Sequence, residues 1–283
     1  MANILKNKID FAIIIGVKNA NPNGDPLNGN RPRINYDGLG EISDVALKRK
    51  IRNRLLDLGE NILMQAHDYR AKGDDYPNIK ARVESVENIK AETTKKGIKD
   101  ADKVLKLACQ EWIDVRTFGQ VLAFGKEGDD SKGLSVPIRG PFSIQPAISL
   151  EPVDVIHSKI VKSMNSTQVG GVQGDRMGDK FRVDEGIYVT FGTMNPQLAE
   201  KTGFTDEDAL KMKDAMRTLF ENDATSARPS GSMEVLKVIW WEQKIGEKVI
   251  SSAKIHRSLN VNADGTYKLD ESLELKPEEL DGM

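Results

Sequence analysis

The chain of 283 residues is long enough for one decorated domain or two, and its 39% hydrophobic and 30% charged content is ordinary for a soluble protein. The formal net charge of −2 argues against a free-standing nucleic-acid binder, a class that is often basic overall. A single cysteine, Cys109, excludes an intramolecular disulfide. The sequence shows neither a signal-peptide pattern nor an apolar run long enough to cross a bilayer, which predicts a cytoplasmic protein without membrane contact.

The first predicted elements are a strand and a helix, separated by a long polar loop. Asp10–Lys18 is almost entirely apolar and β-branched in the middle, which is typical of a strand. The next 23 positions, 19–41, are rich in Asn, Pro and Gly and are predicted to form a loop. A helix is predicted to begin after Ser43, which can cap it, and to end at Gly59. Its apolar stripe consists of Leu47, Ile51, Leu55 and Leu58.

The polar face of this helix is strongly basic. From Arg31 to Arg54 the chain holds seven cations against three acids, and Asp44 is the only acid among the helix cations. Like charges three or four positions apart cost roughly a few tenths of a kcal/mol per pair. This pattern favours an anionic partner, such as phosphate, over a solvated helix face. The seven cations are Arg31, Arg33, Lys48, Arg49, Lys50, Arg52 and Arg54.

Three consecutive motifs in this region carry a resemblance to a known family: NPNGDP at 21–26, GNRPR at 29–33 and SDVALKRKIR at 43–52. They resemble the start of the backbone subunit of type I CRISPR effector complexes (Cascade). These subunits are the crRNA-binding type-seven Cas proteins of the RAMP superfamily, and the match is closest to subtypes I-C and I-B. The resemblance implies an RRM-like palm, many copies polymerised head to tail along one guide RNA, and no cleavage by this subunit.

Residues 60–133 are predicted to be an insertion off the palm, with helices at Glu60–Ala71 and Asp100–Trp112. In the resembled family this insertion is called the fingers. Four prolines interrupt the following segment, 134–157, which is therefore predicted to form two short strands or a kinked edge. The segment 159–182 contains four glycines and few bulky residues. It is read either as a flexible loop or as a hairpin-like projection, the thumb of the resembled family.

The remaining elements are a strand at Val183–Met194, a helix at Thr205–Phe220 with a Thr205–Asp208 capping box, and a strand at Met233–Trp241. Without insertions, the order of elements predicts an α+β fold of the ferredoxin-like or RRM type, βαββαβ. The predicted division is a palm at 1–59 and 134–262 that carries the thumb, the fingers at 60–133, and an acidic tail at 263–283.

The predicted RNA-binding residues follow from matching the family's pattern position by position. The aromatic motif with which RRM sheets stack bases is absent, so phosphate contacts are expected to supply the affinity. A glycine-rich thumb that cannot hold its own shape is expected to lie over the guide bound by a neighbouring copy, giving an open filament. The expected contacts are Asn21, Asn23, Arg31, Arg33, Lys48, Arg49, Arg52, Gln145, His157, Met164, Asn165, Thr167, Gln168, Arg176, Met177, Lys180, Phe181 and Arg228.

The sequence also contains features of an RNA-cleaving subunit. Related type III backbone subunits cut target RNA through an aspartate in the loop after the first strand, where this chain has Asp25 and Asp37. Both lie in ordinary turn contexts, which argues against catalysis. The glycine-rich segment fits neither a P-loop nor a dinucleotide-binding spacing, and the three histidines have no metal-like spacing, so no cofactor is expected. The expected partners are crRNA, target DNA, further copies of the chain, and the guide 5′-end-binding, large and small subunits.

Overall fold

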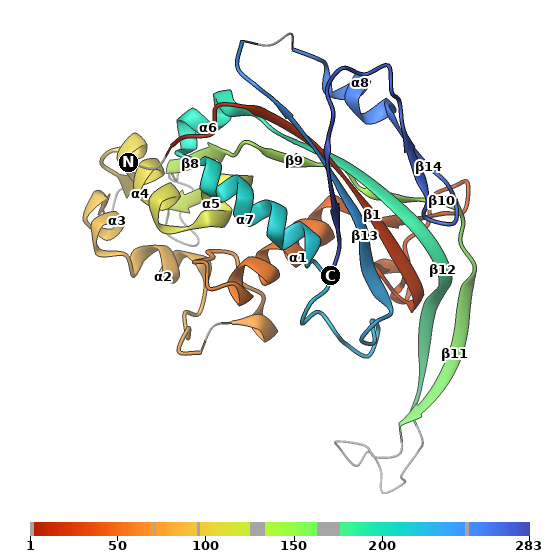
Figure 1. Ribbon diagram of the computed structural model, residues 1–283. Helices are drawn as coiled ribbons and strands as arrows, with labels where there is room; N and C mark the ends of the chain where they lie inside the picture. The colour runs from red at the N-terminus through yellow and green to blue at the C-terminus, as the bar shows by residue number, and fades with distance from the viewer. Residues whose placement is uncertain (1–2, 71, 95–96, 125–133, 163–175, 247–248) are drawn as a thin grey trace, which may run out of the picture.

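The computed structural model describes residues 3–70, 72–94, 97–124, 134–162, 176–246 and 249–283, and it is built around one antiparallel sheet (Figure 1). The main path of the sheet runs β16-β13-β1-β12-β10-β4, and β9 and β11 also pair with β12. Every pairing in it is antiparallel. The strands are β1 (Lys8–Ala20), β4 (Leu39–Ile42), β9 (Phe142–Ile144), β10 (Ala147–Pro152), β11 (Val155–Lys162), β12 (Arg176–Met194), β13 (Met233–Gln243) and β16 (Glu278–Asp281).

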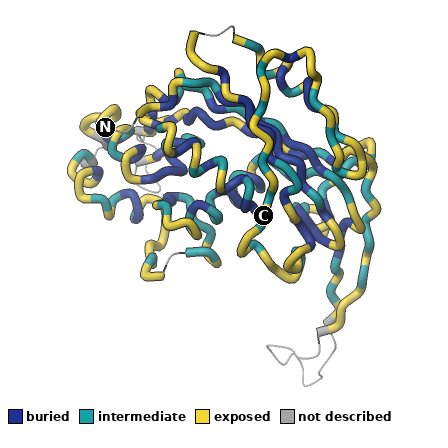
Figure 2. The backbone as a smooth tube through the Cα atoms, in the orientation of Figure 1, coloured by how far each residue is buried: buried dark blue, intermediate teal, exposed yellow. Residues whose placement is uncertain are grey.

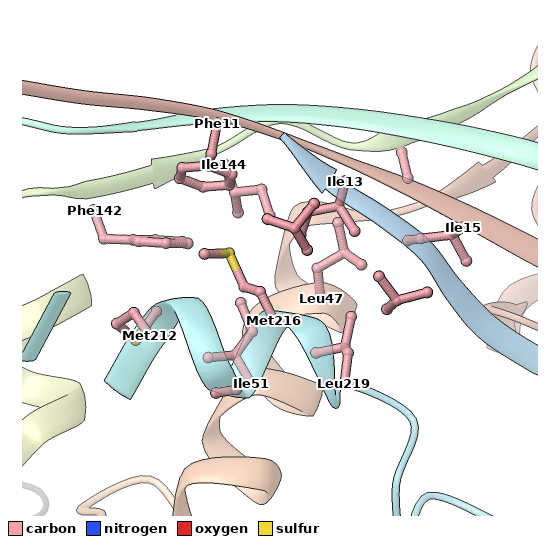
Figure 3. Close-up of a cluster of buried hydrophobic side chains, with 14 of the residues drawn as sticks. Phe11, Ile13, Ile15, Leu47, Ile51, Phe142, Ile144, Met212, Met216 and Leu219 are labelled. Carbon is pink, nitrogen blue, oxygen red and sulfur yellow. The ribbon is translucent and has the colours of Figure 1, made fainter. Parts of the chain in front are cut away.

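Two helices cover one face of this sheet, α1 (Asp44–Asp57) and α7 (Asp206–Arg217). Their apolar stripes meet alternate residues of β1, as Figure 3 shows for Phe11, Ile13 and Ile15. Within the sheet, β12 approaches the same aromatic ring closely, since a Cβ atom at Gly192 would lie 2.1 Å from Cζ of Phe11. Both predicted helices are confirmed together with their caps: Ser43 caps α1, and the capping box of Thr205 and Asp208 opens α7.

The opposite face of the sheet is covered over part of its length by α8 (Ser252–Arg257), β14 (Leu259–Val261) and β15 (Tyr267–Leu269). Ile239 and Trp241 are buried there against Ile255 and Leu273. The predicted acidic tail is therefore partly ordered by its leucines. It also contributes the edge strand β16, which the sequence did not predict.

The insertion between α1 and β9 has a hydrophobic cluster of its own, which includes Cys109 and Trp112. Burial raises the pKa of the Cys109 thiol to about 12, as expected for an inert core cysteine. The helix predicted at Glu60–Ala71 is wrong except for one 3₁₀ turn, η2 (His67–Tyr69). The other elements are α2 (Ile79–Glu84), α3 (Glu87–Glu92), β5 (Thr93–Thr94), β6 (Gly97–Ile98), α4 (Ala101–Glu111), α5 (Ile113–Phe118), β7 (Gly119–Phe124) and β8 (Leu134–Arg139).

Strand β8 pairs with β7 and buries Val136 and Ile138 in this second cluster, so the structure groups it with the insertion. A buried ion pair joins the insertion to the helices on the main sheet: Arg116 on α5 donates from Nε and Nη2 to Asp208 on α7 over 3.0 and 2.8 Å. Burial disfavours the charged form of Asp208, but the hydrogen bonds from Arg116 and Thr205 hold its pKa below the ordinary value.

Strands β11 and β12 leave the body as a two-stranded ribbon, whose outer part is largely exposed (Figure 2). Strand β12 is 19 residues long and exchanges partners without a gap, because Val183 pairs with both Ala20 of β1 and Val155 of β11. Residues 163–175 of the predicted thumb, 159–182, lie outside the described residues. In the described part of the chain, no helix is both long and apolar enough to cross a bilayer.

Candidate nucleic-acid interface

The loop between β1 and α1 is built by its own asparagines and glycines. A short hairpin joins β2 (Gly24–Asp25) to β3 (Arg31–Pro32) around the 3₁₀ turn η1 (Pro26–Asn28). Asn21 is buried, and its side-chain amide donates to the backbone oxygen of Asn30 over 2.7 Å. The Asn23 side chain accepts from the Ser43 backbone over 2.9 Å. The NPN motif therefore braces the loop against the first turn of α1.

The root of the ribbon brings three predicted RNA contacts together. The Phe181 ring stacks on the His157 ring with centroids 4.5 Å apart, and the Arg31 guanidinium lies 4.3 Å from the same centroid. Phe181 is only 8% exposed, so these neighbours already cover most of it. His157 Nε2 lies 2.6 Å from Oδ1 of Asp179, and this bond together with Lys159 holds the pKa of Asp179 below its ordinary value.

Further along the ribbon, Met177 is 71% exposed and Lys180 is half-buried. Their register alternates along β12, with Met177 opposite Val161 and Lys180 opposite Ser158. Met164, Asn165, Thr167 and Gln168 lie outside the described residues, and Arg176 is described only as the first position of β12.

The cations of α1 are less available than the sequence suggests. Lys48 pairs with Asp44 over 2.9 Å and keeps a quarter of its side chain exposed. Arg49 donates to the backbone oxygen of Met64, and burial, with Arg52 nearby, lowers its pKa. Arg52 donates to Asp114 over 3.1 Å. Arg54 donates to the Thr218 hydroxyl over 2.7 Å.

Within the helix, Asp44 and Asp57 are the acids beside these cations, whereas the tertiary structure adds Asp114 and Asp223. Repulsion within the helix therefore does not by itself require an external anion. Arg33, in the preceding loop, remains on the surface, 3.7 Å from Asp25.

The fifth cation of the helix, Lys50, is buried and was not among the predicted contacts. Its ammonium binds Asp223, which also accepts from Nε of Arg228 over 2.9 Å. Burial lowers the pKa of Lys50 to about 8 despite the attraction of Asp223. Position 50 lies between the apolar positions 47 and 51 of the helix, and this spacing was the available signal that it turns inward.

Several of the predicted contacts lie around this loop, although Arg49 and Arg52 bind the insertion instead. The backbone of Asn21 donates to Ala227 over 2.8 Å, so the loop that carries Arg228 lies beside the loop that carries Arg31. Gln145 does not join them, because its backbone pairs with Phe191. Phe191 lies ten residues along β12 from Phe181, which corresponds to roughly 30 Å of extended strand.

Asp25 and Asp37 have the turn roles that the sequence predicted. Oδ1 of Asp25 accepts from the Leu27 backbone over 3.1 Å and caps η1. Asp37 is exposed and lies in a turn, where its backbone N–H donates to Oδ1 of Asn35 over 2.9 Å. Among the described residues, no group of three or more His, Cys, Asp or Glu side chains is placed to hold a metal ion.

The sheet face that α8 leaves open forms a hollow of about 620 Å³. Its floor includes Gly16 and Gly186, and among the described residues Lys18 is the only lysine or arginine that lines it. The carboxylates around the hollow would repel a polyanion. They belong to Glu151, Asp154, Asp184, Glu185, Glu234 and Asp264.

Comparisons with known proteins point in the same direction. A model of the family described as CRISPR-associated protein Cas7 matches residues 7–277. The CRISPR-associated protein Cas7 of Haloferax volcanii is 28% identical over 242 residues, which are 80% of this chain and 67% of that protein.

Two solved structures are more distant. A chain of a "CRISPR RNA-guided surveillance complex, pre-nicking" is 16% identical with a TM-score of 0.49, over 88% of this chain and 81% of that one. A chain of a "CRISPR RNA-guided surveillance complex" is also 16% identical, with a TM-score of 0.45 over 92% and 77%. Scores below 0.5 are too low to establish a shared fold, whereas the family match spans nearly the whole chain.

Proposed function

The chain belongs to the Cas7 family of CRISPR-associated proteins, and from this premise we propose that it is a crRNA-binding backbone subunit of a type I effector complex of the Cascade kind. It acts in the cytoplasm without catalysing RNA cleavage. Its partners are the guide RNA, target DNA paired with the guide, further copies of itself, and the guide 5′-end-binding, large and small subunits.

An RRM-like palm, an insertion as fingers and the β11–β12 ribbon as thumb are part of this proposal. The strand order β13-β1-β12-β10 with α1 and α7 on one face supports a ferredoxin-like βαββαβ core. The separate hydrophobic cluster of the insertion supports treating it as a unit, extended to include β8.

The observation that carries the proposal is the convergence of Arg31, His157 and Phe181 beside the β1–α1 loop. RRM proteins bind bases on the open sheet face. Here that face is covered by α8 at one end and lined by carboxylates at the other. The loop side offers the opposite chemistry, because Arg31 is exposed and Lys48 is partly exposed. The guide therefore runs along the loop and the ribbon root and is held by its phosphates.

Binding of a labelled single-stranded RNA at several salt concentrations tests this. Arg31→Ala and Lys48→Ala should each weaken binding, and each should reduce the slope of log K against log salt by roughly 0.7, the value for one phosphate contact on a single strand. Lys254→Ala and Arg257→Ala, on the helix that covers the sheet, are matched controls that should bind as the wild type does. Unchanged binding by the Arg31 and Lys48 variants would contradict the proposed path.

Head-to-tail assembly is tested separately by sedimentation. The wild type should form multi-copy particles only when a guide RNA is present, and the particle length should follow the RNA length. A variant lacking 168–178 should remain a folded monomer that does not assemble. Particles of wild-type size from that variant, or the same oligomer from RNA-free protein, would refute guide-dependent assembly through the thumb.

A further inference from the structure

One carboxylate beneath the loop surface holds two cations at once. Lys50 on α1 and Arg228 in the loop after α7 both donate to Oδ2 of Asp223. The Lys50 side chain is 6% exposed, that of Asp223 15%, and that of Arg228 25%. Only the arginine therefore extends appreciably from this buried cluster to the surface.

The cluster lies beside the proposed path of the guide. The loop that contains it is anchored to the end of β1 at two points, where Lys18 donates to Ser232 and Asn21 donates to Ala227, each over 2.8 Å. Arg228 therefore follows directly after Ala227, whose backbone oxygen accepts from Asn21 of the NPN motif.

Two cations brought together in a partly buried site repel each other unless a carboxylate lies between them. Asp223 has this position, and it accepts from Nε, so the Nη1 and Nη2 donors of Arg228 are not used in this bond. A guanidinium is planar and rigid, so fixing one edge also fixes the direction of the other donors.

We propose that Asp223 is a positioning residue that orients Arg228, so that Nη1 and Nη2 of Arg228 donate hydrogen bonds to a phosphate of the guide RNA. This inference rests on the proposed function, but it makes a prediction of opposite sign to simple electrostatics. Removing a negative charge beside a bound polyanion should tighten binding if charge alone matters. Removing a positioning carboxylate should weaken binding, although the protein becomes more positive.

The test is RNA binding by Asp223→Asn over a range of salt concentrations. We expect binding roughly tenfold weaker, comparable to the loss of one charge-assisted hydrogen bond, and a salt slope smaller by roughly 0.7. If Asp223 only supported the fold, its replacement would reduce the fraction of protein able to bind RNA but would not change the slope of log K against log salt. Asp223→Glu should restore part of the affinity. Glu221→Gln, which removes the same charge from an exposed side chain two residues away, should not weaken binding.

Two further measurements keep the test decisive. In an Arg228→Ala background the change at Asp223 should have no further effect on affinity, since the arginine through which it acts is missing. If Asp223→Asn unfolds because Lys50 is left unpaired, Lys50→Met with and without Asp223→Asn gives the same comparison. Tighter or unchanged binding by Asp223→Asn overturns the inference, whereas a wild type that binds no RNA refutes the proposed function instead.

Discussion

Replacing Arg52 should destabilise the fold, although Arg52 is also a candidate RNA contact. Its partner Asp114 is 1% exposed and accepts from Arg52 over 3.1 Å and from the Leu63 and Met64 backbones over 2.8 and 3.1 Å. Removing one member of a buried ion pair costs about 3–5 kcal/mol. Because two amide donors remain on Asp114, we expect Arg52→Ala to lower the free energy of unfolding by about 2–3 kcal/mol.

Urea unfolding followed by tryptophan fluorescence measures this change. Lys48→Ala, on the same helix, is the matched control and should cost no more than about 0.5 kcal/mol, because its pair with Asp44 is a partly exposed i,i+4 contact. Asp114→Asn in the Arg52→Ala background should recover part of the loss, since the unpaired buried charge is removed. An Arg52→Ala variant as stable as the Lys48→Ala variant would show that the Asp114 pair does not hold the insertion to the palm.

Three other outcomes follow from the structure. Gly192→Ala should destabilise the protein by at least about 2 kcal/mol in thermal or urea unfolding, because the added methyl group would overlap the ring of Phe11. Gly16→Ala is the control and should be tolerated far better, because the nearest atom to its added methyl group would be 3.4 Å away. The pKa of Lys50 is lowered from 10.5 to about 8, so between these pH values Lys50 is protonated in the unfolded chain and neutral in the folded chain. The free energy of unfolding should therefore rise with pH across this window in the wild type, and this rise should be absent in Lys50→Met. Asp25→Ala and Asp37→Ala should leave RNA binding within about twofold of wild type, and metal-dependent RNA cleavage lost in either variant would revive the type III reading.

The fold was predictable where short-range patterns decide it. The apolar run of β1, the Ser43 cap and the capping box of α7 depend on neighbours within four residues, and the structure confirms them. The short strand β16 was missed because tertiary contacts stabilise Glu278–Asp281: it pairs with β13, more than thirty residues away, and Arg217 of α7 donates to its backbone.

The candidate site was harder to predict for the same reason. The sequence identified the cations of α1 but could not show which carboxylates the fold brings to them, so Lys50 and Asp223 were not recognised as a pair. The stack of His157 on Phe181 depends on the register between β11 and β12. A register is set by tertiary packing, and a shift of one residue would place these side chains on opposite faces.

The continuity of β12 has a mechanical consequence. The strand runs from the ribbon into the centre of the sheet, and the two ladders overlap at Val183, which pairs with β11 and with β1 at once. The paired ribbon, Val155–Lys162 with 176–183, behaves as a stiff lever arm of about 25 Å, and a load on its outer end is transmitted to the backbone hydrogen bonds of β1. Binding of a partner to the outer end of the ribbon should therefore slow amide hydrogen exchange in β1, which pairs with β12 inside the sheet.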